Sequence, residues 1–459
     1  MVLADIAVYV TDKISSEDIT IEEYVTTDSL LQNKRGRCEA QNLPPVACSL
    51  THFEEGDILV ANIRPYLKKV WLADSEGGCS ADVLVFRAKE GHSSEYLHAV
   101  LLQDAFFSYA MKGVKGSKMP RGDKDQIMRF PIQQVSPSDE PRIGNIIHSI
   151  NRKIQLNSEI NHYLEAMAKQ LYDYWFVQFD FPDENGKPYK SSGGKMVWNE
   201  KLKREIPEGW SGGCFSDIAN ITMGQSPDGS SYNEDGNGVI FYQGSTDFGI
   251  RFPSVRMYTT APTRFAKHGD ILMSVRAPVG AVNIANADCC IGRGLSAINA
   301  KIGTITYIYF VIHYLKVRFD NLNSVGTTFG SITKDELHGL PVVVPSDDVL
   351  KLFESASKPI FDMQMNIGQE IEGLTLQRDE LLPLLMNGQV SVKQLNNDLA
   401  TSTEKDTQCV HFCGLFRLLV TCAMIEMLYD RIFCGHRMEI VIFSYICGAV
   451  AEKIASAQT

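Results

Sequence analysis

The chain has 459 residues, of which 44% are apolar and 22% are charged, as is usual for soluble globular proteins. At roughly 100 to 200 residues per domain, this length predicts two to four domains. The formal net charge of −11 argues against indiscriminate binding of polyanions, although it is compatible with a local basic face.

The N-terminal residues do not form a signal peptide pattern. Met1 is followed by a strand-like segment that carries Asp5, Asp12 and Lys13, rather than by a basic stretch and an apolar run. The cysteines that precede the C-terminal tail show neither disulfide-framework nor zinc-site spacing. These observations favour a reducing cytoplasm.

The first module is expected to be a mixed α/β domain. Short apolar and β-branched runs at 58–63 and 83–86, bounded by Gly, Pro and Asp, predict strands, and a helix is expected over about 94–109. A basic loop follows, with six cations at Lys112, Lys115, Lys118, Arg121, Lys124 and Arg129. Because glycines punctuate this loop, its backbone is able to approach a phosphate closely. The alternative is a solvated surface loop without a ligand.

A long helix is predicted next, over about 138–180. Ser138, Asp139 and Pro141 form a good helix start. From there apolar residues recur at alternating spacings of four and three, which indicates a heptad seam interrupted by Asn157 and Asn161. A buried Asn in such a seam fixes register at a cost in stability.

The second half of the chain repeats this order. Strands are predicted at 271–275 and 342–344 and a helix at about 305–317. A second long helix is expected over about 347–386, with Pro359 marking a kink or a start. We expect the two long helices to pair and hold the modules apart; the alternative is that each is a core helix of its own domain.

The repeat is also literal. GDILVANIRP at 56–65 returns as GDILMSVRAP at 269–278, and the Asp-Ile-Ala run at 5–7 returns at 217–219. This period is far longer than the 20 to 50 residues of solenoid units, so the sequence predicts a duplicated domain.

Motifs of catalysis do not stand out. No P-loop, GxSxG or HExxH pattern occurs, NLPP at 42–45 reads as a turn, and the histidines are scattered singly. We therefore predict no catalytic residues and no metal site, and a chain that recognises a partner rather than transforming it.

The ordered motifs resemble those of the specificity subunit of type I restriction-modification systems. The resemblance covers about residues 1–395 and rests on KREIPEGW (203–210), FSDIANITMGQSP (215–227), CCIGRGLSAI (289–298), the paired GDIL motifs and the exits MRFPI and HGLPVVVP. It implies two α/β (α+β) target-recognition domains separated by two long antiparallel coiled-coil helices, with an internal pseudo-twofold repeat. It also implies a non-enzymatic, cytoplasmic reader of double-stranded DNA without a membrane anchor.

The resemblance further implies partner subunits. Two methyltransferase subunits and, in the full complex, restriction subunits would carry S-adenosylmethionine, ATP and Mg, with no cofactor on this chain. The expected organisation is recognition domain 1 (1–137), central helix (138–180), linker (181–210), recognition domain 2 (211–346), C-terminal helix (347–392) and a Cys-rich apolar tail (393–459).

Candidate contacts follow from this assignment. For DNA they are Lys112, Lys115, Lys118, Arg121, Gln225, Ser226, Arg251 and Thr327, while Arg64 and Arg276, repeated in both halves, are expected to be structural or to hold phosphate. For the partner subunits they are Ile150, Asn157, Asn161, Leu164, Leu171, Ile367, Leu374 and Leu381.

Two other classes of function stay open at this point. The repeated domains could form a protein-binding scaffold that does not contact DNA, or the chain could be a nuclease or methyltransferase with a degenerate motif. The tail, with Cys409, His411 and Cys413, lacks zinc-site spacing, and Arg417 and Glu426 interrupt its apolar run. We interpret the tail as a read-through or frame-altered extension rather than a functional part.

Overall fold

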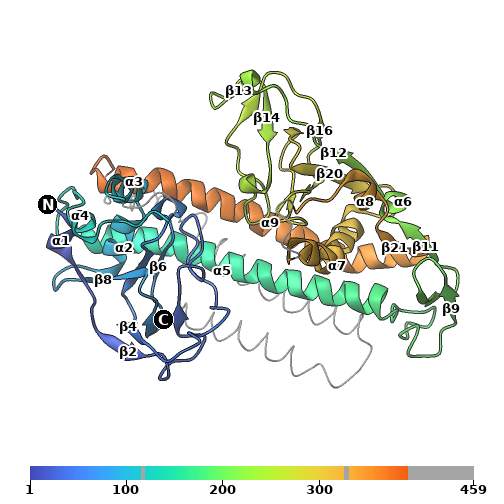
Figure 1. Cartoon of the computed structure of the whole chain (residues 1–459), viewed down its shortest axis with the longest axis horizontal. Coiled ribbons are helices and arrows are strands. Elements are labelled where there is room, and N and C mark those ends of the chain that lie inside the picture. The colour runs from blue at the N-terminus through green and yellow to red at the C-terminus, as the bar shows by residue number, and fades with distance from the viewer. Residues whose placement is uncertain (115–118, 325–329, 391–459) are drawn as a thin grey trace, which may run out of the picture. The chain divides into compact units, whose positions relative to one another are not determined.

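The computed structural model describes residues 1–114, 119–324 and 330–390, so the predicted tail lies outside the described residues. The chain divides into two compact units (Figure 1). Unit 1 contains residues 1–159 and the described chain from Gln369, and unit 2 contains residues from Ile160 to Gly368. Two long helices, α5 (Glu140–Tyr172) and α9 (Asp347–Met386), each begin in one unit and end in the other. The expected boundaries had instead set each helix apart as a segment of its own.

Unit 1 is a mixed α/β domain. Its elements are α1 (Leu3–Ile6), β1 (Ala7–Tyr9), β2 (Lys13–Ser15), β3 (Tyr24–Val25), β4 (Ser49–Phe53), β5 (Ile58–Ala61), a 3-10 turn (Pro65–Leu67), β6 (Val70–Leu72), β7 (Gly77–Cys79), β8 (Val83–Ala88), α2 (Ser94–Leu102), α3 (Asp104–Lys112) and α4 (Lys124–Met128). One sheet has the order β1-β8-β5-β6 and the other β2-β4-β7-β3. Every strand pair is antiparallel except β3 with β7, which is parallel.

Unit 2 contains more strands. Its elements are a π-helical turn (Asp173–Val177), β9 (Met196–Asn199), β10 (Arg204–Pro207), β11 (Ser211–Cys214), α6 (Phe215–Ile218), β12 (Ala219–Met223), β13 (Tyr232–Asn233), β14 (Val239–Tyr242), β15 (Tyr258–Thr259), β16 (Phe265–Ala266), β17 (Ile271–Ser274), β18 (Val282–Ile284), β19 (Cys289–Ile291), β20 (Leu295–Ala300), α7 (Ile305–Ser324), α8 (Lys334–His338) and β21 (Pro341–Val344), with 3-10 turns at Gly229–Ser231 and Ser245–Asp247. Two short antiparallel pairs, β9–β10 and β11–β21, are separate from the two larger sheets.

The two units share a sheet topology. The order β12-β20-β17-β18 in unit 2 has the same pattern as β1-β8-β5-β6 in unit 1, and β14 pairs in parallel with β19 as β3 does with β7. The repeated GDIL motif supplies the central strands β5 and β17, whose residues are all buried. Sequence duplication is therefore accompanied by duplication of the strand arrangement.

The aspartate of the motif explains part of this repetition. Asp57 accepts a hydrogen bond from the amide of Glu54 at 2.9 Å, and Asp270 accepts one from the amide of Lys267 at 2.8 Å. In both units, the glycine before the aspartate has a positive φ, 87° at Gly56 and at Gly269. Glycine adopts this conformation without a steric cost, so the pair forms the same tight turn ahead of each central strand.

Most predicted elements are present with altered bounds. The helix expected over 94–109 is interrupted at Gln103, whose extended backbone separates α2 from α3. Helix α9 begins at Asp347 and is continuous past Pro359, so the proline is not a helix start. The central helix is shorter than predicted because it changes to the π-helical turn after Tyr172.

Both long helices are core elements of the units. In unit 1, Ile143 and Ile147 of α5 share a buried cluster with Leu382 and Leu385 of α9. In unit 2, Leu164 and Leu171 of α5 lie in a cluster that contains Phe353 of α9, and the ring of Phe353 is 5.5 Å from that of Trp175. Much of the predicted seam is therefore buried in the cores of the units, as expected from the alternative in which each long helix is a core helix.

The helices run in opposite directions within unit 1. The Asn157 amide donates to Glu370 at 3.0 Å, and Arg378 donates to the Asn151 carbonyl oxygen at 3.0 Å. Along these contacts, the residue numbers rise on α5 as they fall on α9, so the two helices are antiparallel there. The second polar seam residue differs, because neither amide atom of buried Asn161 has a hydrogen-bond partner among the described residues. Within those residues, no helix is long and apolar enough to cross a lipid bilayer.

Unit 1 buries a histidine that makes its stability sensitive to acid. Desolvation, with smaller effects of His148 and Arg378, lowers the pKa of His98 from 6.5 to about 3. Below pH 6.5 the unfolded chain binds a proton at this histidine that the folded chain excludes. The free energy of unfolding should therefore decrease by about 1.4 kcal/mol for each unit by which the pH is lowered. Replacing His98→Gln should reduce the pH slope between pH 6.5 and 4 by this amount, as measured by denaturant unfolding, while buried His313, whose pKa desolvation lowers to about 4, keeps its own contribution. The exposed-site variant His268→Gln should retain the slope; an unchanged slope in the His98 variant would contradict the assignment.

Candidate nucleic-acid interface

Several strands of unit 2 end beside one turn, residues 291–294. The amide of Gln225, after β12, donates to the Ile291 carbonyl at 3.0 Å. The amide of Gly292 donates to the carbonyl of Tyr242, the last residue of β14, at 2.8 Å. Val275, after β17, donates to the Gly294 carbonyl at 2.9 Å. These bonds gather five exposed polar residues, here called the unit 2 strand-end surface: Gln225, Gln243, Arg264, Arg276 and Arg293.

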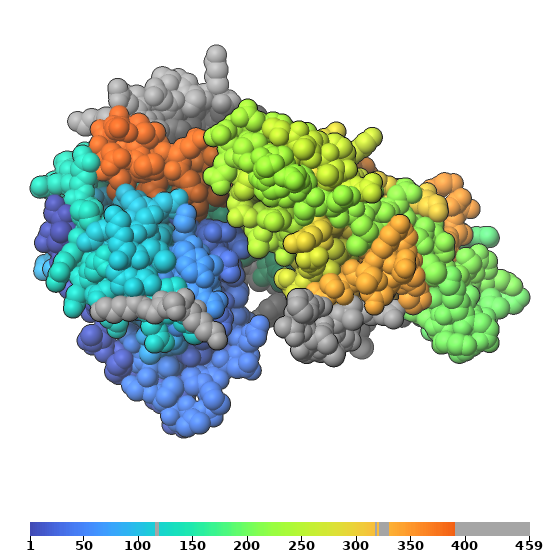
Figure 2. Space-filling view, turned by 45° about the horizontal axis from the view of Figure 1, so that its top comes forward, coloured from blue at the N-terminus to red at the C-terminus, as the bar shows by residue number. Residues whose placement is uncertain are grey.

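Glycines allow this convergence. A Cβ at Gly224 would lie 2.1 Å from the Gly292 carbonyl oxygen, and one at Gly294 would lie 2.7 Å from the Gln243 carbonyl oxygen. Both distances are shorter than any Cβ contact tolerates, so only glycine permits the backbones to meet. Three turns are thereby held closely, and their side chains project from a fixed frame. In Figure 2, the strands and loops of unit 2 form the yellow-green part of the surface.

The surface carries cations that are free of local ion pairs. Arg264, Arg276 and Arg293 are exposed, and none of them forms a salt bridge with a described residue. Arg256, by contrast, is paired with the buried carboxylate of Asp247. A guanidinium that is not engaged by a carboxylate keeps its fork of donors available for phosphate or a base edge.

The predicted residues of unit 2 have different surroundings. Gln225 and Arg276 are exposed, and Ser226 is half-buried with its hydroxyl accepting from the Arg293 amide at 3.3 Å. Thr327 lies outside the described residues. Gln243, Arg264 and Arg293 were not predicted, although Arg293 stands within the CCIGRGLSAI motif and its flanking glycines were a usable signal.

Arg251 requires a correction. It is only 6% exposed, its Nη1 donates to the Tyr309 hydroxyl at 2.5 Å, and its guanidinium lies 5.2 Å from the centre of that ring. Burial is the main cause that raises the pKa of Tyr309, so its hydroxyl stays protonated. A side chain held inside the unit is not available to DNA, because the loop that carries it faces the helices.

Unit 1 has a related arrangement, here called the unit 1 strand-end surface (Arg64 and Arg121). Exposed Arg64 follows β5, and its amide donates to the Pro120 carbonyl at 2.8 Å. A backbone bridge joins Ile63 to Arg121, as another joins Arg276 to Ser331 in unit 2. Arg121 pairs with Asp82 at 2.9 Å, but both side chains are more than a third exposed, so water screens this pair.

The other predicted cations of unit 1 are Lys112, Lys115 and Lys118. Lys112 is exposed at the last residue of α3. Lys115 and Lys118 lie outside the described residues. Of the predicted cations of unit 1, the structure brings Arg64 and Arg121 together through the backbone contacts between their two segments.

Half of the predicted partner-binding residues are internal. Asn157, Asn161, Leu164 and Leu171 are buried within their own units, and Ile150, Ile367, Leu374 and Leu381 are half-buried. A side chain already packed within the chain cannot also form a partner surface without unfolding its own core. The strongly exposed apolar residues of α9 are instead Leu352 (49%) and Leu376 (60%), which lie off the predicted seam.

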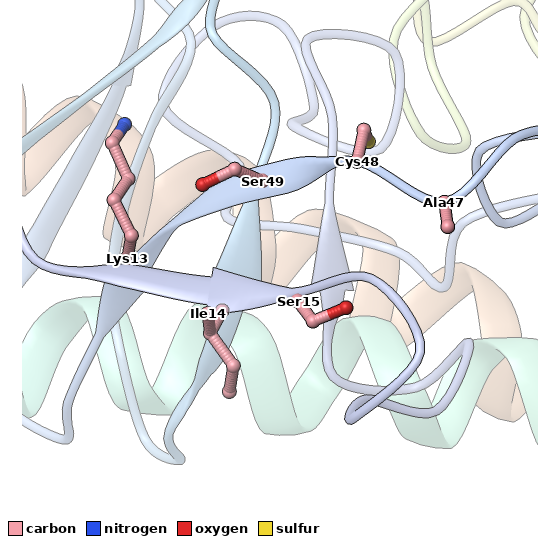
Figure 3. A pocket seen from close by; sticks show the side chains of 6 residues that line it. All are labelled: Lys13, Ile14, Ser15, Ala47, Cys48 and Ser49. Atoms are coloured by element: carbon pink, nitrogen blue, oxygen red, sulfur yellow. The ribbon is translucent and has the colours of Figure 1, made fainter.

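An open hollow of about 340 Å³ lies elsewhere in unit 1 (Figure 3). It is lined by Lys13, Ile14, Ser15, Ala47, Cys48 and Ser49, from β2 and from the segment that enters β4. Among these residues only Lys13 is a cation, and no carboxylate or imidazole stands beside the thiol. The hollow is thus unrelated to either strand-end surface.

Comparison with known proteins gives a consistent family. Residues 207–372 match the type I restriction modification DNA specificity domain. The chain is 33% identical over 359 residues to the putative type I restriction enzyme MjaX specificity subunit of Methanocaldococcus jannaschii, across 74% of this chain and 79% of the relative. It is 24% identical to the MjaIX specificity subunit of the same organism, across 76% and 81%. The crystal structure of the type I S subunit from M. genitalium aligns with a TM-score of 0.48 at 16% identity, across 84% of this chain and 95% of that one. The predicted resemblance is confirmed: the chain belongs to the family of type I restriction-modification specificity subunits.

Proposed function

We propose that this chain is the DNA-reading subunit of a type I restriction-modification complex, in which each unit reads one half of a bipartite site. The observation that carries the proposal is the repetition of one strand arrangement with exposed arginines at the same strand ends, Arg64 in unit 1 and Arg276 in unit 2. Membership of the specificity-subunit family supports a role in DNA recognition. Two similar modules with different side chains suit a target made of two different halves.

The side chains of the unit 2 strand-end surface have the chemistry for this task. Glutamine is able to pair with both major-groove atoms of adenine, and arginine with both acceptors of guanine. Gln225, Gln243 and Arg293 therefore suit base reading. Arg64 and Arg276 each follow the central strand of the repeated motif while the expected half-sites differ, so they suit phosphate contact, which is independent of sequence.

Catalysis would be carried out by the partner subunits. The methyltransferase subunits would bind S-adenosylmethionine and would dock on the helices, where exposed Leu352 and Leu376 of α9 offer apolar contacts. Restriction subunits would join through that assembly and supply ATP and Mg chemistry. Since all of these substrates are chromosomal or cytosolic, the complex would act in the cytoplasm.

Neutralising two arginines should weaken DNA binding through its electrostatic part. The double variant Arg264→Gln/Arg276→Gln, in complex with the methyltransferase subunit, should lose up to about 2 units of the slope of log affinity against log salt. Titration of a fluorescent cognate duplex at several salt concentrations measures this slope. Lys190→Gln/Lys201→Gln makes the same charge change at exposed sites of the linker and should leave the slope nearly unaltered. Equal losses in both double variants would argue against a defined interface.

Exchanging one module should change one half of the target. Residues 1–137 would be replaced by those of another specificity subunit, and genomic methylation would be mapped by single-molecule sequencing. We expect a new sequence in one half-site and the original sequence in the other, because each unit has its own sheets and its own strand-end surface. A change in both halves would contradict separate reading, and a protein scaffold that does not contact DNA would leave no sequence-specific methylation to map.

A further inference from the structure

In unit 2, the loop after β14 inserts a buried cation among the helices. An antiparallel bridge between Phe248 and Pro253 closes the tip of this loop. Its Arg251 donates to Tyr309 of α7 and packs beside Gly368 of α9, where a Cβ would lie 2.9 Å from the Arg251 Cβ. The carbonyl of Arg251 also accepts from the Ile284 amide of β18 at 3.0 Å. The loop therefore joins the sheets of the unit to its helices.

In unit 1, the loop after β3 likewise directs a buried cation, here a lysine, toward the helices. A bridge between Leu30 and Arg37 closes this loop. The Lys34 side chain is 4% exposed, and its Nζ lies 2.8 Å from Asp104 of α3 and 3.2 Å from Asp379 of α9. Burial opposes the ionisation of Asp104, but hydrogen bonds from Lys34 and Lys68 prevail and hold the pKa of its carboxyl below the ordinary value.

The backbone of the unit 1 loop is held in an uncommon conformation. Asn33 and Lys34 both have positive φ, 59° and 60°, which non-glycine residues adopt rarely. Their amides donate to the Leu67 and Lys68 carbonyls at 2.9 and 2.8 Å, and these bonds fix the turn that directs Lys34 toward the helices. Local strain of this kind persists only where the surroundings impose it.

The contact extends into the helix pair. Asp379 also accepts from the neighbouring Arg378, which is 2% exposed and donates to Asn151 of α5. The loop of unit 1 is thus connected to both long helices through charged groups. A buried cation that loses its partner is costly, so this geometry is specified more strictly than an apolar contact would be.

The two loops occupy equivalent places in the repeat. Each follows the strand that pairs in parallel within its unit, β3 with β7 and β14 with β19, and each is closed by an isolated bridge. We infer that Lys34 and Arg251 are positioning residues, which fix the strand-end surface of each unit on its helices and thereby set how strictly the chain discriminates the spacer between half-sites. This inference rests on the proposed function.

The physical reason is the geometry of DNA. One additional base pair in the spacer rotates one half-site by about 35° and moves it by about 3.4 Å relative to the other. A reader excludes the altered spacer only if each surface is held rigidly enough that it cannot follow this change. Loosening a surface on its helix should relax spacer discrimination while the chemistry that reads each half-site is unaffected.

The test compares Lys34→Met and Arg251→Met with wild type, each in complex with the methyltransferase subunit. Methylation rates would be measured on duplexes with the natural spacer and with one base pair more or fewer. We expect the ratio of natural to altered rates to fall on the order of three- to tenfold in each variant. The penalty for a mismatch within a half-site should stay the same. Lys13→Met changes an exposed cation of β2 in unit 1 and should keep the wild-type ratio.

The outcomes separate the possible failures. A wild-type complex without a bipartite preference would refute the proposed function itself. A bipartite wild type whose variants melt at lower temperature but keep the wild-type spacer ratio would overturn the positioning role, because a purely structural residue has that effect. If a methionine variant fails to fold, Lys34→Arg and Arg251→Lys replace it, because they retain the charge but not the donor geometry. The ratio of methylation rates on natural and altered spacers is then measured for these variants, and an unchanged ratio contradicts the positioning role.

Discussion

The described fold depends on the burial of the apolar faces of α5 and α9. Each helix gives one part of its length to the core of one unit and the rest to the core of the other unit. Phe353, which is fully buried, contacts aromatic rings from α5, α7 and the π-helical turn. Burying one such ring contributes about 2 to 3 kcal/mol. A helix that supplies core residues to two domains cannot be shifted in register without disturbing both.

The duplicated sheets build, on this stable base, the strand-end surfaces that we propose for DNA recognition. The motif Gly-Asp-Ile-Leu buries its aliphatic residues in the central strand, and the aspartate closes the turn before it. At the other end of the strand the chain leaves with an exposed arginine, Arg64 or Arg276. The same short motif thus stabilises the sheet at one end and presents a cation at the other.

Burial decides what each cation does. Arg276 and Arg293 lie at strand ends whose glycine-rich backbones leave the side chains exposed. Arg251 of the same unit is enclosed by Tyr309 and by α9 at Gly368. The first environment leaves the donors to solvent or to a polyanion, whereas the second engages them within the chain. Identical side-chain chemistry therefore serves either a surface or an internal contact, depending on the direction that the loop takes.

The sequence by itself determined the duplication, the mixed α/β class, the central strands and the start of α9 at Asp347, because these depend on short-range signals: apolar runs, turn residues and helix caps. The family assignment followed from the order of the same motifs. The tertiary structure alone decided that Leu164 and Leu171 are core rather than partner-binding residues, that Arg251 is internal, and that Gln243, Arg264 and Arg293 converge. Heptad spacing specifies an apolar face but not what covers it, and no local pattern encodes which strand ends meet, since those contacts join segments far apart in the chain.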